Sequence, residues 1–254
     1  RKAIATPAIT YLTGLAQARG IEIDVADPGD LVFTGGRLQN GGRPVDVMVR
    51  AFFTPMLSYL GDRLDGIKAA LRAESLCMIT SLQSGLFGLK SLFAMATDPA
   101  LDLDVPAEQL AIAQAHLPWT RIVAGGTSTD PGGSTIDLLS HIAANRDHLV
   151  IKPTEGYGGA GVELGWTHSE QSWAAVIERA AAGGHVVQER VPIITEEYTV
   201  LEEGFPIHRF NGDHNPLLCG GKVAGYYVRL APETSGITNV TGGGASVAPT
   251  FILT

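Results

Sequence analysis

The sequence of 254 residues contains little cysteine, and its cysteines are not arranged as a metal site. Cys77 and Cys219 lie far apart, and neither belongs to a CxxC pair. This excludes a disulfide-rich secreted scaffold and predicts a reducing, cytoplasmic setting. The histidines form no HExxH motif and no cluster, so we expect His148, His185 and His214 to be structural or exposed rather than metal ligands.

Long apolar runs and an excess of positive charge are also missing. No apolar run reaches the roughly 18 residues of a transmembrane helix, and no signal peptide is visible. The formal net charge of -8 argues against a general binder of nucleic acid or anionic membranes. We therefore expect neither nucleic acid nor a membrane as a partner. The chain begins at Arg1 rather than methionine, which predicts that N-terminal sequence is missing.

The order of apolar patterns predicts an α/β or α+β fold with mixed sheets. Residues 1–52 have the pattern of a β-α-β unit with an added hairpin, in which 21–27 (IEIDVAD) alternates like a strand. The polar loop 127–135 (TSTDPGGST) is the best candidate for a disordered segment or a domain boundary. Beyond residue 194 we expect short strands and glycine turns, with a strand at 236–240 (GITNV) and a turn at 212–216 (GDHNP).

One segment, 149–165 (LVIKPTEGYGGAGVELG), carries most of the chemistry. An apolar strand ends at Lys152, and a second strand follows the intervening glycine loop. Glycine permits a positive φ and lets N–H groups approach an anion, while lysine neutralises phosphate oxygens. The loop is not a P-loop, which needs GxxxxGK[ST] before a helix, and it is not a dinucleotide-binding loop, because a strand follows it. The alternative is a glycine-rich hairpin with an exposed lysine. The loop residues taken as phosphate-binding candidates are Gly156, Tyr157, Gly158, Gly159 and Gly161.

With the helix expected at 169–182 and the strand at 186–191 (VVQERV), this segment resembles the central nucleotide-binding module of the ATP-grasp superfamily. The resemblance implies that Lys152 contacts the α- and β-phosphates of ATP and that the glycine loop closes over them. It also implies that adenine lies along the strand end formed by Gln188, Glu189 and Val191. Glu189 alone would indicate only a solvated charge at a strand end.

The flanking segments extend the resemblance to roughly residues 84–254. Lys90, in SGLFGLKSLFA, matches the family's first ATP lysine, although alone it would indicate a surface lysine. Arg229 matches an arginine that reaches the transferred phosphate, and an arginine fork suits a γ-phosphate or acyl-phosphate. Asn239 matches an asparagine near the metal and the acyl-phosphate, followed by the substrate candidates Gly242 and Gly243. Alone, Arg229 would indicate a charge on a sheet surface.

The resemblance implies that the chain is divided into four parts with different roles. Residues 1–83 fit an α/β substrate domain, 84–147 a linker with the first part of the ATP-grasp fold, 148–193 the central nucleotide-binding subdomain, and 194–254 the C-terminal core. Arg50, at a strand end of the first part, is a candidate for binding substrate or phosphate.

Among ATP-grasp proteins, the chain most resembles the circularly permuted members related to glutathionylspermidine synthase. The segments that carry this resemblance are VVQERV, GGKVAGYYVRL and NVTGGG. The metal site departs from this pattern. The family holds Mg²⁺ with an E-x-N element, which lies after the Asn-Gly-Gly segment or, in permuted members, near the N-terminus. Neither place has one here, so the metal ligands are predicted to be missing, with Asp213 and Asn215 a poor substitute.

The activity implied is an ADP-forming carboxylate–amine ligase that uses ATP and Mg²⁺. ATP phosphorylates a carboxylate, and an amine attacks the acyl-phosphate to form an amide. The expected partners are a small-molecule or peptide carboxylate and an amine, with a homodimer by analogy. The alternatives are a non-catalytic ATP-binding protein of the same fold, a small-molecule kinase, and an interaction domain whose glycine loops are only turns.

Overall fold

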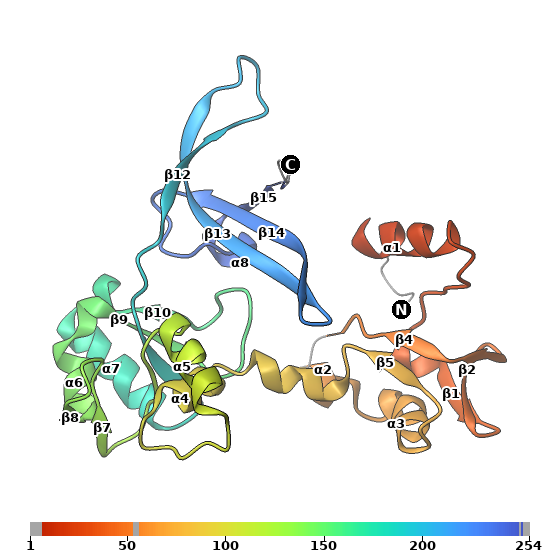
Figure 1. Cartoon of the computed structure of the whole chain (residues 1–254), viewed down its shortest axis with the longest axis horizontal. Helices are drawn as coiled ribbons and strands as arrows, with labels where there is room; N and C mark the ends of the chain where they lie inside the picture. Colours follow the sequence, from red (N-terminus) through yellow and green to blue (C-terminus); the bar gives the residue numbers. More distant parts are fainter. Residues whose placement is uncertain (1–6, 53–55, 249, 251–254) are drawn as a thin grey trace. The chain divides into compact units, whose positions relative to one another are not determined.

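The computed structural model describes residues 7–52, 56–248 and 250. The chain divides after Gly88 into two compact units, Arg1–Gly88 and Leu89–Thr254 (Figure 1). Sheets of different size and helices alternate along both, which confirms a mixed α/β class. The finer division of residues 84–254 into subdomains stays a prediction. In the described part of the chain, no helix is long and apolar enough to cross a bilayer.

The first unit contains a three-stranded antiparallel sheet and a separate parallel strand pair. The added hairpin expected within residues 1–52 is confirmed and turns at Gly35-Gly36, with a second turn at Gly41-Gly42, and these glycines have positive φ. Helix α3 packs closely on the sheet because Gly66 lacks a side chain: an added Cβ would lie 2.2 Å from the carbonyl oxygen of Leu31. The elements are α1 (Pro7–Gln17), η1 (Pro28–Asp30), β1 (Leu31–Thr34), β2 (Arg37–Asn40), β3 (Arg43–Val45), β4 (Val47–Val49), α2 (Met56–Leu60), η2 (Gly61–Leu64), α3 (Asp65–Arg72), β5 (Cys77–Ile79) and η3 (Leu82–Gly88).

The strand expected at residues 21–27 is absent, so the β-α-β prediction for this region is wrong there. Its apolar residues Ile21 and Val25 are 56% and 43% exposed, because no sheet edge pairs with the segment. Its acidic residues Glu22 and Asp24 form ion pairs with Arg43 instead. The earlier strand of that prediction falls on residues 2–8, most of which lie outside the described residues.

The second unit contains an antiparallel sheet in the order β10-β9-β11-β6 and another in the order β12-β13-β14-β15. The elements of the first half are α4 (Ser91–Thr97), α5 (Ala107–His116), β6 (Thr120–Ile122), β7 (Thr127–Thr129), β8 (Thr135–Asp137), α6 (Leu138–Ala144), η4 (Arg146–His148), β9 (Leu149–Pro153), β10 (Glu163–Leu164), η5 (Gly165–Thr167), α7 (Glu170–Ala181) and β11 (His185–Glu189). Those of the second half are β12 (Thr195–Thr199), β13 (Ile207–Cys219), β14 (Lys222–Pro232), α8 (Val240–Gly243) and β15 (Ser246–Ala248).

The core of the second unit lies between α6, α7 and the sheet of β9 and β11. The helix predicted at 169–182 is confirmed as α7, and the Ser169 hydroxyl caps it by accepting from the Ser172 N–H at 3.2 Å. The buried Trp173 of α7 donates from its indole N–H to the Ile142 carbonyl at 3.0 Å, so α7 and α6 are joined. The apolar strand β9 fills the centre, which fixes the point where Lys152 emerges.

Three further expectations for the second unit are wrong. Residues 127–135 form the hairpin β7–β8 rather than a disordered boundary, because the Asp130 side chain accepts from the Ser134 N–H and so closes the turn. GDHNP lies within the long strand β13 rather than in a turn. GITNV forms no strand, and it leads instead into the one-turn helix α8.

Candidate functional site

Lys152 stands at the end of β9 and is half-buried. Its ammonium donates to Gln188 Oε1 at 2.6 Å, and the buried Gln188 in turn donates from Nε2 to Thr120 Oγ1 at 2.9 Å. Burial lowers the pKa of the Lys152 amine, and the positive charge of Lys90 lowers that pKa further. Over the described chain, Lys152 forms no salt bridge. A desolvated ammonium without a carboxylate partner is a candidate for binding an anion.

Lys90 lies beside the same strand end, immediately before α4. Its backbone N–H donates to the Thr154 carbonyl at 2.9 Å, and its ammonium donates to the Gly156 carbonyl at 3.1 Å. Burial lowers the pKa of the Lys90 amine, although Glu155 acts in the opposite direction. The structure therefore brings together the two lysines that sequence analysis predicted to bind ATP.

The glycine loop between β9 and β10 turns sharply. Gly158 and Gly159 have φ values of 73° and 78°, a left-handed conformation that glycine adopts without strain. A Cβ added to Gly159 would lie 3.4 Å from Ile237 Cγ2, and one added to Gly158 would lie 4.0 Å from Asn239 Nδ2. The loop thus lies against the segment that carries Asn239. Tyr157 is exposed.

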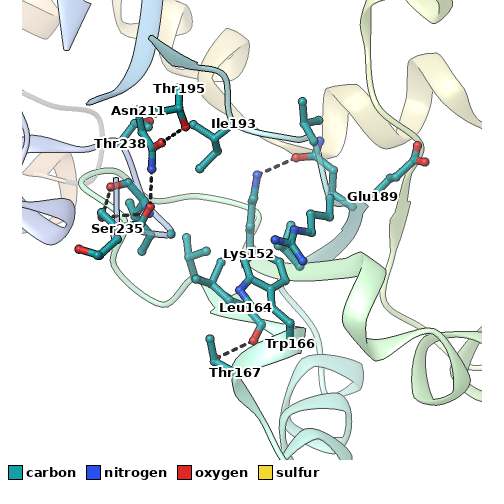
Figure 2. Close-up of a pocket in the computed structure, with 18 of the residues that line it drawn as sticks. Lys152, Leu164, Trp166, Thr167, Glu189, Ile193, Thr195, Asn211, Ser235 and Thr238 are labelled. Carbon is teal, nitrogen blue, oxygen red and sulfur yellow. Dashed lines mark hydrogen bonds between the residues drawn. The ribbon is translucent and has the colours of Figure 1, made fainter. Parts of the chain in front are cut away.

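A cavity of about 730 Å³ lies next to Lys152 (Figure 2). Lys152 extends toward it, with Leu164 and Trp166 on one side and Asn211, Ser235 and Thr238 on the other. Its apolar lining residues are Val150, Val162, Leu164, Trp166, Val191, Ile193 and Ile237. Its polar lining residues include Lys152, Gln188, Glu189, Arg190, Thr195, Asn211, Ser235 and Thr238. An apolar section next to a cationic strand end is suited to a ligand with an aromatic and an anionic part.

Trp166 and Arg190 form a wall of this cavity that sequence reasoning missed. The Arg190 guanidinium lies 3.9 Å from the centre of the Trp166 ring, a cation–π contact. Gly165 positions the tryptophan, because a Cβ there would lie 2.0 Å from the Arg146 carbonyl oxygen, and so η5 packs closely on η4. The Gly165-Trp166 pair just after the second strand of the loop was the available signal.

Of the adenine candidates, Gln188, Glu189 and Val191 all line the cavity. Gln188 is buried and bonded to Lys152, whereas the side chains of Glu189 and Val191 are exposed. The Glu189 N–H donates to the Trp119 carbonyl at 2.9 Å, so this backbone donor is engaged within the sheet. Their contact with a base stays a prediction.

Arg229 faces Asp213 across the paired strands β14 and β13, and the two side chains form a salt bridge. The Asp213 carboxylate also accepts from Thr238 Oγ1 at 3.0 Å and from Asn215 Nδ2 at 2.9 Å. Arg229 Nε is buried and has no hydrogen-bond partner among the described residues. Asp213 and Asn215 are therefore strand residues within a hydrogen-bonded network.

Asn239 closes the turn around α8, since its carbonyl accepts from the Gly243 N–H at 2.8 Å. Gly243 is required there for packing, because an added Cβ would lie 1.9 Å from the Ile237 carbonyl oxygen. Gly242 lies in the same helical turn. A substrate contact for either glycine stays a prediction.

Arg50 lies in the other unit, just after β4. Its guanidinium donates to the Thr80 carbonyl at 2.8 Å and to Ser84 Oγ at 3.1 Å, and it also contacts the Phe52 carbonyl. These bonds join the ends of β4 and β5, and they give Arg50 a local structural role. Its contact with substrate or phosphate stays a prediction.

The donor set for a metal ion is incomplete in the part of the chain that the structure describes. No three His, Cys, Asp or Glu side chains are grouped there in a way that could hold an ion. Asp213 has its oxygens engaged by Arg229, Thr238 and Asn215. These residues do not fit a magnesium site.

Comparison with known proteins found no matching family model and no matching curated protein. Among solved structures, the chain is similar to the ATP-grasp ligase PsnB complexed with a minimal precursor, at 15% identity and a TM-score of 0.48, over 90% of this chain and 74% of that one. The same ligase complexed with minimal precursor, Mg and ADP is similar at 17% identity and a TM-score of 0.43, over 76% of this chain and 65% of that one. Values this low establish neither a family nor an activity for this chain.

Proposed function

We propose that the chain binds ATP in the cavity beside Lys152, and that it is an ATP-grasp enzyme that activates a carboxylate for ligation to an amine. The observation that carries the proposal is the pairing of Lys90 and Lys152 at one glycine loop, where neither is ion-paired within the described chain. Two partly desolvated ammonium groups raise the free energy of the folded state. A bound polyphosphate would relieve that cost, since it supplies the missing negative charge.

The cavity's apolar section supports the other half of the ligand. Val150, Leu164 and Trp166 provide a surface on which a purine can stack, next to the strand end that bears Glu189. The phosphates would then extend toward Lys152, Lys90 and the N–H groups of the glycine loop. Donors fixed before the reaction stabilise developing charge without a reorganisation cost.

In the proposed reaction a carboxylate oxygen of the substrate attacks the γ-phosphorus of ATP, and ADP leaves. The amine then attacks the carbonyl carbon of the acyl-phosphate, phosphate leaves, and the amine loses a proton as the amide forms. Arg229 is the candidate for contacting the transferred phosphoryl group. The acid is proposed to be a small molecule or peptide. Magnesium enters with ATP, and no group of three His, Cys, Asp or Glu side chains among the described residues could hold the ion by itself.

Calorimetric titration of Mg-ATP tests the binding step. Lys152→Ala is expected to weaken ATP binding about 10- to 100-fold, as for the loss of a roughly 1.5–3 kcal/mol hydrogen bond to a charged group. Lys222→Ala is the matched control, since it removes an exposed lysine of the same unit that does not line the cavity, and it should leave the affinity unchanged. Equal affinities of the wild type and Lys152→Ala would contradict the proposal.

A non-catalytic ATP-binding protein is the second candidate. It is favoured by the Arg229–Asp213 salt bridge, because a carboxylate next to the arginine competes with phosphate for it. Hydroxylamine separates the two, since it captures acyl-phosphates as hydroxamates. Hydroxamate formed from an amino-acid and peptide mixture only when ATP is present supports the ligase. ATP binding with no hydroxamate and no ADP release supports the second candidate.

A further inference from the structure

We infer that Asp213 is a positioning residue, whose carboxylate fixes Arg229 and the segment 235–239 in one arrangement beside the glycine loop. This rests on the proposed function, because it assigns to Arg229 a contact with the terminal phosphate of ATP. The sequence analysis considered Asp213 only as a poor metal ligand, and the inference gives it a different role beside Arg229.

The first support is that both oxygens of the Asp213 carboxylate accept hydrogen bonds. Oδ2 accepts from Arg229 Nη2 and from Thr238 Oγ1, and Oδ1 accepts from Asn215 Nδ2. The side chains of Asp213 and Arg229 are 22% and 25% exposed. A carboxylate bonded in this way is a fixed acceptor in a hydrogen-bond network. It is not placed to ligate a metal ion.

The second support is that the ion pair has little value for stability alone. The desolvation of a largely buried pair offsets most of its Coulombic attraction. Here the cost is larger, because Arg229 Nε is buried with no partner among the described residues. What the pair does provide is geometry: Asp213 is the register partner of Arg229 on the neighbouring strand and restricts the guanidinium to one position.

The third support is the connection from Asp213 to the glycine loop. Thr238, which donates to Asp213, directly precedes Asn239. Gly158 and Gly159 of the loop lie next to the Asn239 side chain, at 4.0 Å and 3.9 Å from their hypothetical Cβ atoms. One carboxylate therefore joins the strand that carries Arg229 to the segment that carries Asn239.

Asn211, two residues before Asp213 on β13, anchors the other end of the same segment. Its side-chain amide is buried and donates to the carbonyls of Ser235 at 2.9 Å and Glu233 at 3.2 Å. Alternate residues of a strand share one face, so Asn211, Asp213 and Asn215 point the same way. The segment 235–239 is thus fixed to this face of β13 at both ends.

The test compares ATP with ADP, because ADP lacks the phosphate that Arg229 is proposed to contact. Calorimetric titrations of Mg-ATP and Mg-ADP are made with the whole chain, the wild type and Asp213→Asn. The variant should bind ATP about tenfold more weakly, as expected for one misplaced charge-assisted contact, while its affinity for ADP should change by less than about twofold. Asp213→Glu, which keeps the charge, should recover part of the ATP affinity.

Glu196→Gln is the matched control, since it removes a carboxylate of the same sheet whose partners are Tyr198 and His214 rather than Arg229 and Thr238. It should change neither affinity. If Asp213→Asn does not fold, Asn215→Ala removes a donor of the carboxylate that does not line the cavity, and it should lower the ATP affinity selectively.

Three results would overturn the inference. An ATP affinity that is unchanged or higher in Asp213→Asn would mean that Asp213 only neutralises Arg229. Equal losses for ATP and ADP would indicate a structural role alone. Both results leave the proposed function intact if the wild type binds ATP. A wild type that binds neither nucleotide would overturn the proposed function, and the positioning role with it.

Discussion

The bond between Lys152 and Gln188 allows a quantitative test of how the site is built. Lys152→Met removes the ammonium but keeps an apolar chain of similar length, and it leaves the buried Gln188 Oε1 without its donor. Gln188→Leu leaves the Lys152 ammonium half-buried without an acceptor. Each single change should destabilise the fold by about 1–3 kcal/mol, the cost of a buried polar group left unpaired.

The double variant removes both partners at once, so it should be less destabilised than the sum of the single changes. We expect a coupling free energy of about 1.5–3 kcal/mol, within the range for directly bonded residues with one charged member. Urea denaturation followed by tryptophan fluorescence measures it. The signal reports on the correct unit, because Trp119, Trp166 and Trp173 all lie in Leu89–Thr254.

Additive effects would refute this reasoning. If the double variant equals the sum of the single variants within about 0.5 kcal/mol, the two side chains do not interact in solution. Gln188 would then not be the group that orients Lys152. Thr120, which accepts from Gln188 Nε2, is left as it is in every variant.

The remaining predictions concern the base, the loop and pH. Mg-ATP should change tryptophan fluorescence, and Trp166→Phe should abolish that change, because the other tryptophans are buried away from the cavity. If ATP changes the fluorescence of Trp166→Phe as much as that of the wild type, the base lies elsewhere. Gly243→Ala should destabilise the unit by about 1–3 kcal/mol in urea titrations, since the added methyl meets the Ile237 carbonyl oxygen; wild-type stability would contradict the packing. Because the pKa values of Lys90 and Lys152 are lowered in the folded state, the unfolded chain binds more protons below the ordinary lysine value of 10.5. Stability should therefore rise with pH between the lowered and the ordinary pKa, while ATP affinity falls. Urea titrations at several pH values in that range measure the stability. A stability that stays flat in both the wild type and Lys152→Met would contradict the prediction.

Local signals in the sequence were sufficient for much of the second unit. Helix α7 was predictable because Ser169 caps it and Gly183-Gly184 follow it, and the apolar run ending at Lys152 predicted β9. The glycine pattern predicted a loop between strands, and the positive φ values of Gly158 and Gly159 explain why glycine is needed there. In each case the determinants lie within a few residues of the element.

The errors arose where distant contacts override the local pattern. Apolar and polar residues alternate over 21–27 as in a strand, but no neighbouring strand pairs with this segment. Its acidic side chains form ion pairs with Arg43 instead. GDHNP contains turn-forming residues, yet residues 226–230 of β14 pair with it along its whole length and keep it extended. The loop 127–135 is ordered in part by Trp119, which donates to the Thr129 carbonyl at 2.9 Å.

The same limit applies to the candidate site. Sequence analysis could single out Lys90, Lys152 and Arg229 because each lies in a recognisable sequence motif. The salt bridge of Arg229 with Asp213 and the stacking of Arg190 on Trp166 join residues that no local pattern connects. Such pairs depend on strand register and on glycine-dependent packing, which only the folded chain displays.

The central claim is that ATP occupies the cavity beside Lys152, and photolabelling with 8-azido-ATP tests its location most directly. The account predicts that the label attaches within residues 150–166 or 188–193, that excess ATP prevents labelling, and that Lys152→Ala greatly reduces it. Labelling that ATP does not compete for, or that falls only within residues 1–88, would contradict the account.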